Sequence, residues 1–107
     1  MKTKELAEQN SIDFLRARIL SKQGPRRIRT SQGLSYVTDI LIADDTGTTI
    51  FNVFGMQKAE ALKIGQVIEI KDGLCNMFNF QKQVSLGQSG RVNIVPDDPS
   101  LPRTIPH

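Results

Sequence analysis

The most constraining feature of this chain is a pair of β-favouring runs joined by a tight-turn sequence. The runs Leu34 to Ala43 (LSYVTDILIA) and Thr48 to Phe54 (TTIFNVF) are rich in β-branched and aromatic residues. Between them lies DDTG, residues 44–47, and Asp and Gly at such a place favour a tight turn. The sequence therefore predicts a β-hairpin over residues 34–54.

An irregular extended segment precedes this hairpin. The run from Ser11 to Lys22 (SIDFLRARILSK) fits neither a two-residue nor a 3.6-residue period throughout, which we interpret as a bent first strand with a bulge. Gly24-Pro25 then interrupts the strand, residues 26–29 resume an extended course, and TSQG at 30–33 supplies a turn. We expect an exposed, basic, hairpin-like loop here.

One short helix and further strands follow the central hairpin. Gly55 ends its second strand, and Met56 to Leu62 is the best local helix-forming run, about two turns long. The elements expected after the helix are a fourth strand over Gln66–Lys71, a turn at Asp72-Gly73, a fifth strand clearest over Gln83–Leu86, and Arg91–Val95, which extends that strand or pairs with it.

Length and composition indicate a single domain. A chain of 107 residues is one compact unit, and no run approaches the ~18 apolar residues of a membrane span. The first ten residues lack the apolar centre of a signal peptide, so we expect a cytoplasmic protein without a membrane partner. We divide the chain into a flexible segment (1–10), the domain itself (11–95), and a Pro-rich tail (96–107) that should be irregular rather than packed.

The order of elements predicts an all-β fold. Five strands with one helix between the third and fourth best match a five-stranded Greek-key barrel, the oligonucleotide-binding (OB) fold. Barrels of this kind bind oligonucleotides or oligosaccharides on one face.

Few residues are suited to catalysis or to metal binding. The single histidine is the last residue, His107, and the single cysteine, Cys75, is most simply a small apolar filler. Asp44 and Asp45 are adjacent carboxylates, for which turn formation is a better explanation than a divalent cation. We expect no enzyme activity, no cofactor and no metal.

A cluster of basic residues points to a polyanionic partner. Fourteen Lys and Arg against eleven Asp and Glu give a net charge of +3, and Arg26, Arg27 and Arg29 fall within four residues without an acid among them. Guanidinium groups bind phosphates through two hydrogen bonds and stack on bases. The alternative is a solvated charged loop, but the absence of a compensating acid favours phosphate binding.

Aromatic residues supply the second part of the expected site. Strand alternation places Phe51 and Phe54 on opposite faces, and Val53 beside Phe51 makes that parity the core, leaving Phe54 with Asn52 on the outer face. The alternative for Phe54 is a position under the short helix.

A second aromatic segment follows the fourth strand. Phe78 and Phe80 are two residues apart, so they point the same way in an extended chain, and Lys82 adds charge beside them. Burial of one or both rings in the barrel is the alternative.

The stretch from Leu34 to Leu86 resembles a known family. Its turn DDTG, the strand end VFG at 53–55, the short helix, the strand IGQVIEI at 64–70 and the aromatic segment occur as in the simple single-stranded DNA-binding proteins of archaea. These are single OB domains akin to replication protein A, and the match covers roughly residues 12–95.

This resemblance implies three base-stacking positions. The first falls on Phe54, before Gly55, and the third on Phe78. The second falls on Leu74, a departure from the family's aromatic residue, and the extra Phe80 is placed to replace it.

We therefore predict binding of single-stranded DNA, largely independent of sequence, in DNA replication, recombination or repair. The expected nucleic-acid-binding residues are Arg26, Arg27, Arg29, Asn52, Phe54, Phe78, Phe80 and Lys82. Two alternatives stay open: an OB-fold protein-interaction subunit of a replication or repair assembly, and an RNA- or tRNA-binding module.

Overall fold

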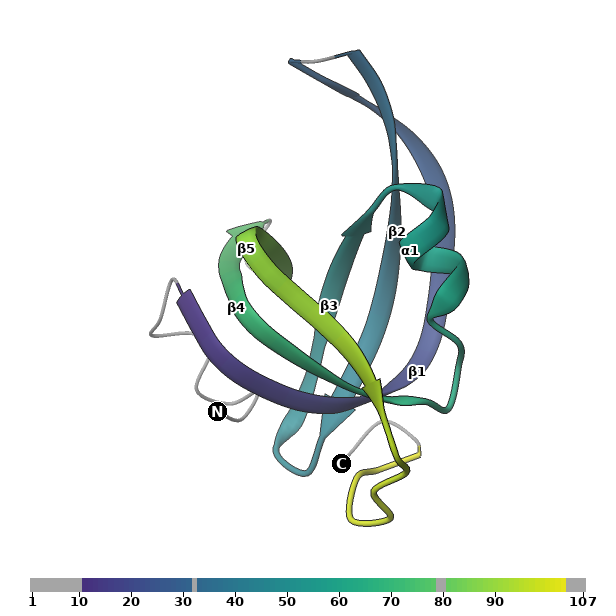
Figure 1. The fold of residues 1–107 in the computed structure, drawn as a ribbon, viewed down its shortest axis with the longest axis vertical. Helices are drawn as coiled ribbons and strands as arrows, with labels where there is room; N and C mark the ends of the chain where they lie inside the picture. The colour runs from purple at the N-terminus through teal and green to yellow at the C-terminus, as the bar shows by residue number, and fades with distance from the viewer. Residues whose placement is uncertain (1–10, 32, 79–80, 104–107) are drawn as a thin grey trace.

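The computed structural model describes residues 11–31, 33–78 and 81–103, which form a closed barrel of five strands with one short helix. The elements are β1 (Ser11–Thr30), β2 (Gly33–Asp44), β3 (Gly47–Phe54), α1 (Met56–Ala61), β4 (Val67–Phe78) and β5 (Gln81–Val95). The order around the barrel is β1-β2-β3-β5-β4, and Figure 1 shows the five strands curving around one interior. The predicted all-β OB barrel, with its helix between β3 and β4, is confirmed.

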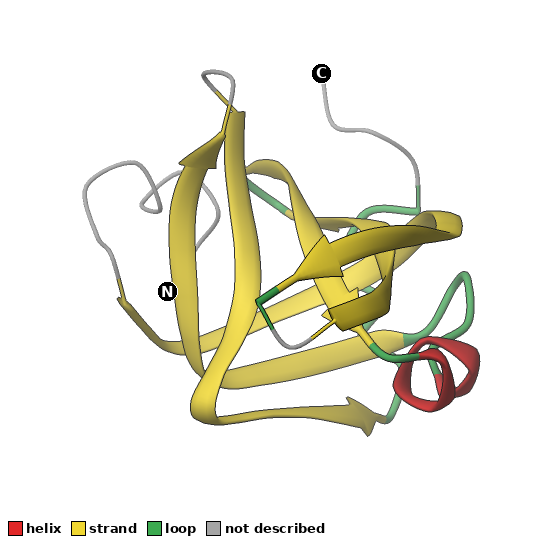
Figure 2. Cartoon of the chain, turned by 90° about the horizontal axis from the view of Figure 1, so that it is seen from above, coloured by secondary structure: helices red, strands yellow, loops and turns green. Residues whose placement is uncertain are grey.

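Closure of the barrel depends on the long first strand. Its first half, from Ser11 to Arg18, pairs with β4, and the rest, from Arg18 to Thr30, pairs with β2. The other closing contact is a parallel pairing of β3 with β5, of which Phe51 opposite Val84 is the centre. Seen from above, in Figure 2, the strands enclose the interior and α1 lies at its rim.

The expected bulge in β1 is present. The pairing of β1 with β2 shifts register between Ile19 and Ser21 and again between Gln23 and Arg26. Gly24 lies at the second shift with a φ of +118°, and a Cβ there would be 3.1 Å from the carbonyl oxygen of Val37. Both the backbone angle and the close approach require glycine at this position.

The barrel interior is filled by aliphatic side chains around Phe51, which is fully buried. The described core consists of Ile12, Leu15, Ala17, Ile19, Ile40, Ile42, Phe51, Val53, Ala59, Leu62, Ile68, Ile70, Cys75 and Val84. Cys75 is 3% exposed, as expected for an apolar filler. Asp44 is buried as well, and its Oδ1 accepts hydrogen bonds from the backbone N–H groups of Thr46 and Gly47, which confirms the tight turn.

The helix α1 is short, as predicted, and is attached to β1 by a lysine. The Nζ of Lys22 donates to the backbone carbonyls of Ala59 and Leu62, at 2.6 Å each, at the carboxyl end of α1. A cation at that end of a helix is favoured by the helix dipole, and here it adds a hydrogen bond to the Ala59 carbonyl, which also accepts from the Leu62 N–H. Among the described residues, no helix is both long and apolar enough to cross a membrane.

The prediction of a turn at Asp72-Gly73 is wrong. β4 continues through these residues to Phe78, and its pairing with β5 shifts register between Lys71 and Gly73. Asp72 has a φ of +54°, and Gly73 is buried with no room for a Cβ, which would be 3.2 Å from the Ser85 carbonyl oxygen. The Asp-Gly pair marks a β-bulge, which needs the same backbone angles as a turn.

The described part of the C-terminal tail, residues 96–103, contains no helix or strand, but the expectation that the tail does not pack is wrong for these residues. Arg18, only 1% exposed, donates to the Gly65 and Asp98 carbonyl oxygens at 2.8 Å and forms an ion pair with Asp97 at 2.6 Å. Further along the tail, the side chain of Leu101 is buried as well. The described part of the tail, residues 96–103, is therefore attached to the base of the barrel. Residues 1–10 and 104–107 lie outside the described residues.

Hydrogen bonds from Ser100 stabilise the charged form of Asp98 in this tail. The Ser100 hydroxyl and backbone N–H both donate to Asp98 Oδ1, at 2.6 and 3.0 Å, and Arg16 lies within 3.5 Å of the other carboxylate oxygen. These contacts hold the pKa of Asp98 below its usual range, the Ser100 hydroxyl contributing most. The pKa of Arg16 is raised, chiefly by its hydrogen bond to Glu69.

Candidate nucleic-acid interface

The outer face of the β2–β3 hairpin presents an exposed aromatic ring. Phe54 is paired with Val37 across the hairpin, and Asn52 is paired with Asp39. The residues that alternate with them, Phe51 and Val53, point into the core. Phe54 is 51% exposed, so its ring is not under α1, and its predicted outward position is confirmed.

A guanidinium lies on the same outer face. Arg26 of β1 is paired with Val37, the residue that faces Phe54 from the other side. Its Nε donates to Asp39 Oδ2 at 3.1 Å, while 58% of the Arg26 side chain stays exposed. The expectation that no acid compensates the arginine cluster is therefore wrong for Arg26, because Asp39 reaches it across the strand pair.

The face continues across the other two strands. Asn52 donates from Nδ2 to Gln83 Oε1 of β5 at 2.8 Å, and Gln83 is paired with Asn76 of β4. Leu74, two residues before Asn76, is paired with Ser85 and is 41% exposed. Cys75, between these two β4 residues, is buried, so Leu74 and Asn76 are on the outside of the barrel.

We call this continuous surface the outer strip. It runs across all five strands, from β1 through β2, β3 and β5 to β4. Its members are Arg26, Val37, Asp39, Asn52, Phe54, Leu74, Asn76, Gln83 and Ser85. An exposed aromatic ring between a guanidinium and amide groups provides stacking, charge and hydrogen bonding on one surface, the three elements of single-strand recognition.

The structure does not bring the three clustered arginines together. From Arg26 to Thr30 the pairing with β2 has no register shift, so neighbouring residues point to opposite faces. Arg26 is on the side of the outer strip, whereas Arg27 and Arg29 are paired with Tyr36 and Leu34 on the other side. Figure 1 shows this part of the β1–β2 hairpin extending beyond the barrel.

The remaining predicted residues are only partly described. Phe78 is the last residue of β4, paired with Gln81, and Lys82 is paired with Met77. The side chains of Phe78 and Lys82 lie outside the described residues, as does the whole of Phe80. Their expected roles stay predictions.

Asp39, Gln83 and Asn76 are among the members of the strip that were missed in the sequence. Asp39 and Gln83 contact Arg26 and Asn52 through cross-strand pairings 13 and 31 residues apart, which no local pattern reveals. Asn76 could have been found, since two-residue alternation away from an apolar Cys75 places it outside.

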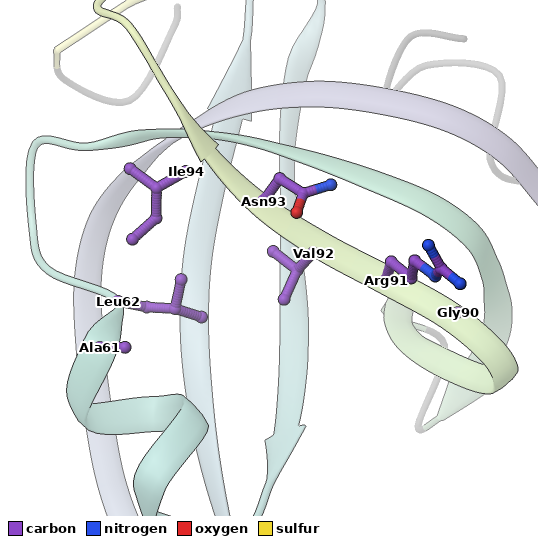
Figure 3. Close-up of a pocket in the computed structure, with 7 residues that line it drawn as sticks. All are labelled: Ala61, Leu62, Gly90, Arg91, Val92, Asn93 and Ile94. Carbon is purple, nitrogen blue, oxygen red and sulfur yellow. The ribbon is translucent and has the colours of Figure 1, made fainter.

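A separate groove lies elsewhere on the barrel. It has a volume of about 370 Å³ and lies between the end of α1 and the second half of β5, as Figure 3 shows. Its lining residues are Ala61, Leu62, Gly90, Arg91, Val92, Asn93 and Ile94. Among the described residues of this lining, Arg91 is the only ionisable side chain, so they include no acid–base pair. The outer strip uses the first half of β5 and does not include the groove.

A closed five-stranded OB barrel with an exposed aromatic and polar strip defines the class of oligonucleotide-binding domains. The family model described as single-stranded DNA binding protein Ssb-like, OB fold, matches residues 9–94. The chain therefore belongs to this Ssb-like OB-fold family, and the resemblance seen in the sequence is confirmed.

Individual relatives agree with this assignment. The single-stranded DNA binding protein Ssb of Saccharolobus solfataricus is 26% identical over 81 residues, which are 76% of this chain and 54% of that protein. The chain thus spans about half the length of this curated relative.

Solved structures share the fold. The OB domain of a Thermoplasma acidophilum protein matches with a TM-score of 0.67 at 22% identity, covering 79% of this chain and 76% of that domain. A replication factor A related protein from Methanobacterium thermoautotrophicum gives 0.65 at 24% identity, with 77% and 78% covered. A replication protein A heterotrimer bound to single-stranded DNA gives 0.71 at 18% identity, covering 90% of this chain and 24% of that one.

Proposed function

We propose that the outer strip binds single-stranded DNA, largely without regard to sequence, and that the protein acts in DNA replication, recombination or repair. The observation that supports this most directly is the exposure of Phe54 on the same face as Arg26. Every base has a flat face that an aromatic ring can stack on, so such a ring binds without selecting a sequence.

Each described residue of the strip has a defined role in the proposal. Phe54 stacks under a base, and Arg26 binds a phosphate with the part of its guanidinium that Asp39 does not engage. Asn52 is held by Gln83 beside the ring, where it lies within reach of the stacked nucleotide. Phe78 and Phe80 would add stacking platforms at the β4–β5 end, and Lys82 a phosphate contact.

Membership of the Ssb-like family supports the same assignment. The related Saccharolobus solfataricus protein is named for binding single-stranded DNA, and the replication protein A heterotrimer was solved bound to it. The proposed role of this chain is that of a non-catalytic binding protein.

Fluorescence anisotropy with labelled dT, rU and duplex oligomers of equal length, at two salt concentrations, tests this function. We expect dT to bind more tightly than duplex, and log Kd to change with log salt with a slope of about 2 to 3.5 for three to five phosphate contacts. Equal affinity for duplex, or binding that ignores salt, would contradict the proposal. A clear preference for rU or for folded tRNA would transfer the assignment to RNA.

A matched pair of variants tests the strip itself. Phe54→Ala removes the stacking ring, and we expect the affinity for dT to fall about 5- to 150-fold, since stacking contributes ~1–3 kcal/mol per base. Ile64→Ala, which truncates a side chain that is 63% exposed after α1 and outside the strip, should leave affinity unchanged. If Phe54→Ala keeps its fold and its affinity, the protein-interaction alternative is favoured instead.

A further inference from the structure

The projecting β1–β2 hairpin has two different faces. Beyond the register shift at Gln23, the pairing runs without interruption from Arg26 opposite Val37 to Thr30 opposite Gly33. Arg26 belongs to the outer strip. The residues that alternate with it form the opposite face, which we call the hairpin back; its members are Arg27, Arg29, Leu34 and Tyr36.

The hairpin back combines exposed apolar and cationic groups. Tyr36 is 40% exposed and Leu34 62%, and each is directly opposite an exposed arginine. Side chains in such pairs are about 5 Å apart at Cβ, so each arginine is beside an apolar neighbour. An aromatic ring flanked by a guanidinium repeats, on this face, the combination found around Phe54.

The charge of the hairpin back is uncompensated. Within the part of the chain that the structure describes, neither Arg27 nor Arg29 forms an ion pair, whereas Arg26 on the other face is paired with Asp39. Two unpaired guanidinium groups beside an exposed ring complement a polyanion with flat bases. An acidic protein surface would satisfy the charges, but it would not use the flat face of the ring in the same way.

We propose that the hairpin back is a second contact surface for single-stranded nucleic acid, separate from the outer strip. It binds the part of the strand that leaves the strip and passes around the edge of the hairpin, with Tyr36 stacking on a base and Arg27 and Arg29 binding phosphates. This inference rests on the proposed function, because the strand is first bound by the strip.

Oligonucleotide length separates the two surfaces. A single OB domain covers ~4–16 nucleotides, so an oligomer of about 5 dT fits the strip alone, whereas one of about 15 dT reaches both surfaces. The chain contains one tyrosine and no tryptophan, so its intrinsic emission reports on Tyr36 alone. We expect the longer oligomer to quench this emission after correction for DNA absorbance, and the shorter one to bind, by anisotropy, without quenching.

Substitution of the two arginines gives an independent readout. The double variant Arg27→Ala/Arg29→Ala should lower the salt slope of the longer oligomer by about 1.4, the amount expected for two lost phosphate contacts, and leave the shorter oligomer unaffected. The control is Lys63→Ala/Lys71→Ala, which removes two exposed cations outside the hairpin. It should change neither oligomer's slope by that amount.

The outcomes distinguish this inference from the proposed function. The longer oligomer could bind without changing the tyrosine emission, and the arginine variant could keep the salt slope of the unmodified protein. In that case binding by the hairpin back is refuted, whereas binding by the outer strip is not. Quenching by the shorter oligomer would overturn the separation of the two surfaces. If neither oligomer binds, the proposed function fails together with this inference.

Discussion

Arg26 and Phe54 face the same residue, Val37, from opposite sides of β2. Val37 is 2% exposed although it is on the outside of the barrel, while the two residues beside it are more than half exposed. The three side chains form one row perpendicular to the strands. The register of the sheet thus holds the charge of Arg26 on one side of β2 and the ring of Phe54 on the other.

The sequence resemblance implies a base-stacking position at Leu74, with an aromatic residue in the family, and Leu74 is 41% exposed on β4. We expect Leu74→Trp to raise the affinity for dT about fivefold or more, because one added platform contributes ~1–3 kcal/mol. The new tryptophan is the only one in the chain, so its quenching by dT provides a second measurement. Ile94→Trp, at a 48% exposed residue outside the strip, is the control and should bind like the unmodified protein. Equal gains from both variants would show that the position in the strip is irrelevant.

Asp39 places a carboxylate within the strip, where it pairs with Arg26. Under the proposed function, its charge would repel a bound phosphate. Replacing it by asparagine keeps the size and removes the charge. Because an exposed pair contributes only ~0.2–1 kcal/mol, we expect Asp39→Asn to raise dT affinity by up to about fivefold, with a steeper salt dependence. Anisotropy titrations at several salt concentrations measure both. Weaker binding would mean that Asp39 is needed to hold Arg26 in position.

Asp97 is the charge partner of the buried Arg18. Removing this carboxylate leaves a desolvated guanidinium with carbonyl partners only, and we expect Asp97→Ala to lower the free energy of unfolding by about 1–3 kcal/mol. Urea denaturation followed by circular dichroism measures the change. Arg103→Ala removes the other partner of Asp97, an exposed one, and should cost less than about 1 kcal/mol. Similar losses in the two variants would contradict the importance of burial.

Gly24 combines a positive φ with close backbone contact at the base of the hairpin. Gly24→Ala should destabilise the protein by about 1–3 kcal/mol, because it adds backbone strain and a Cβ 3.1 Å from the Val37 carbonyl oxygen. Gly65→Ala is the matched comparison, since its φ is +94° but its Cβ would meet nothing within 4 Å. Thermal unfolding of both variants separates crowding from backbone strain. The comparison fails if Gly65→Ala is the more destabilising of the two.

Local patterns predicted most of the fold because turns and alternation are local properties. The hairpin around residues 44–47 and the outward position of Phe54 follow from residues close in sequence. The same locality explains the error at Asp72-Gly73, since a bulge and a turn favour the same residues. Which of the two forms is decided by the pairing with β5.

The candidate site was only half predictable, because its polar contacts are formed between strands. Nothing near Arg26 in the sequence indicates that its carboxylate partner is Asp39, which the hairpin register brings beside it. Likewise, the cluster of arginines looked like one patch until strand alternation divided it between two faces. The packing of the tail was missed because Arg18 and Asp97 are 79 residues apart in the chain.

The outer strip draws side chains from every strand, including both partners of the short parallel pairing that closes the barrel. A fragment ending at Phe54 would keep the arginine and the ring but lose Gln83, which steadies Asn52, and the whole β4 end. The complete strip therefore exists only in the closed barrel, and any change that separates β3 from β5 would divide it into two parts.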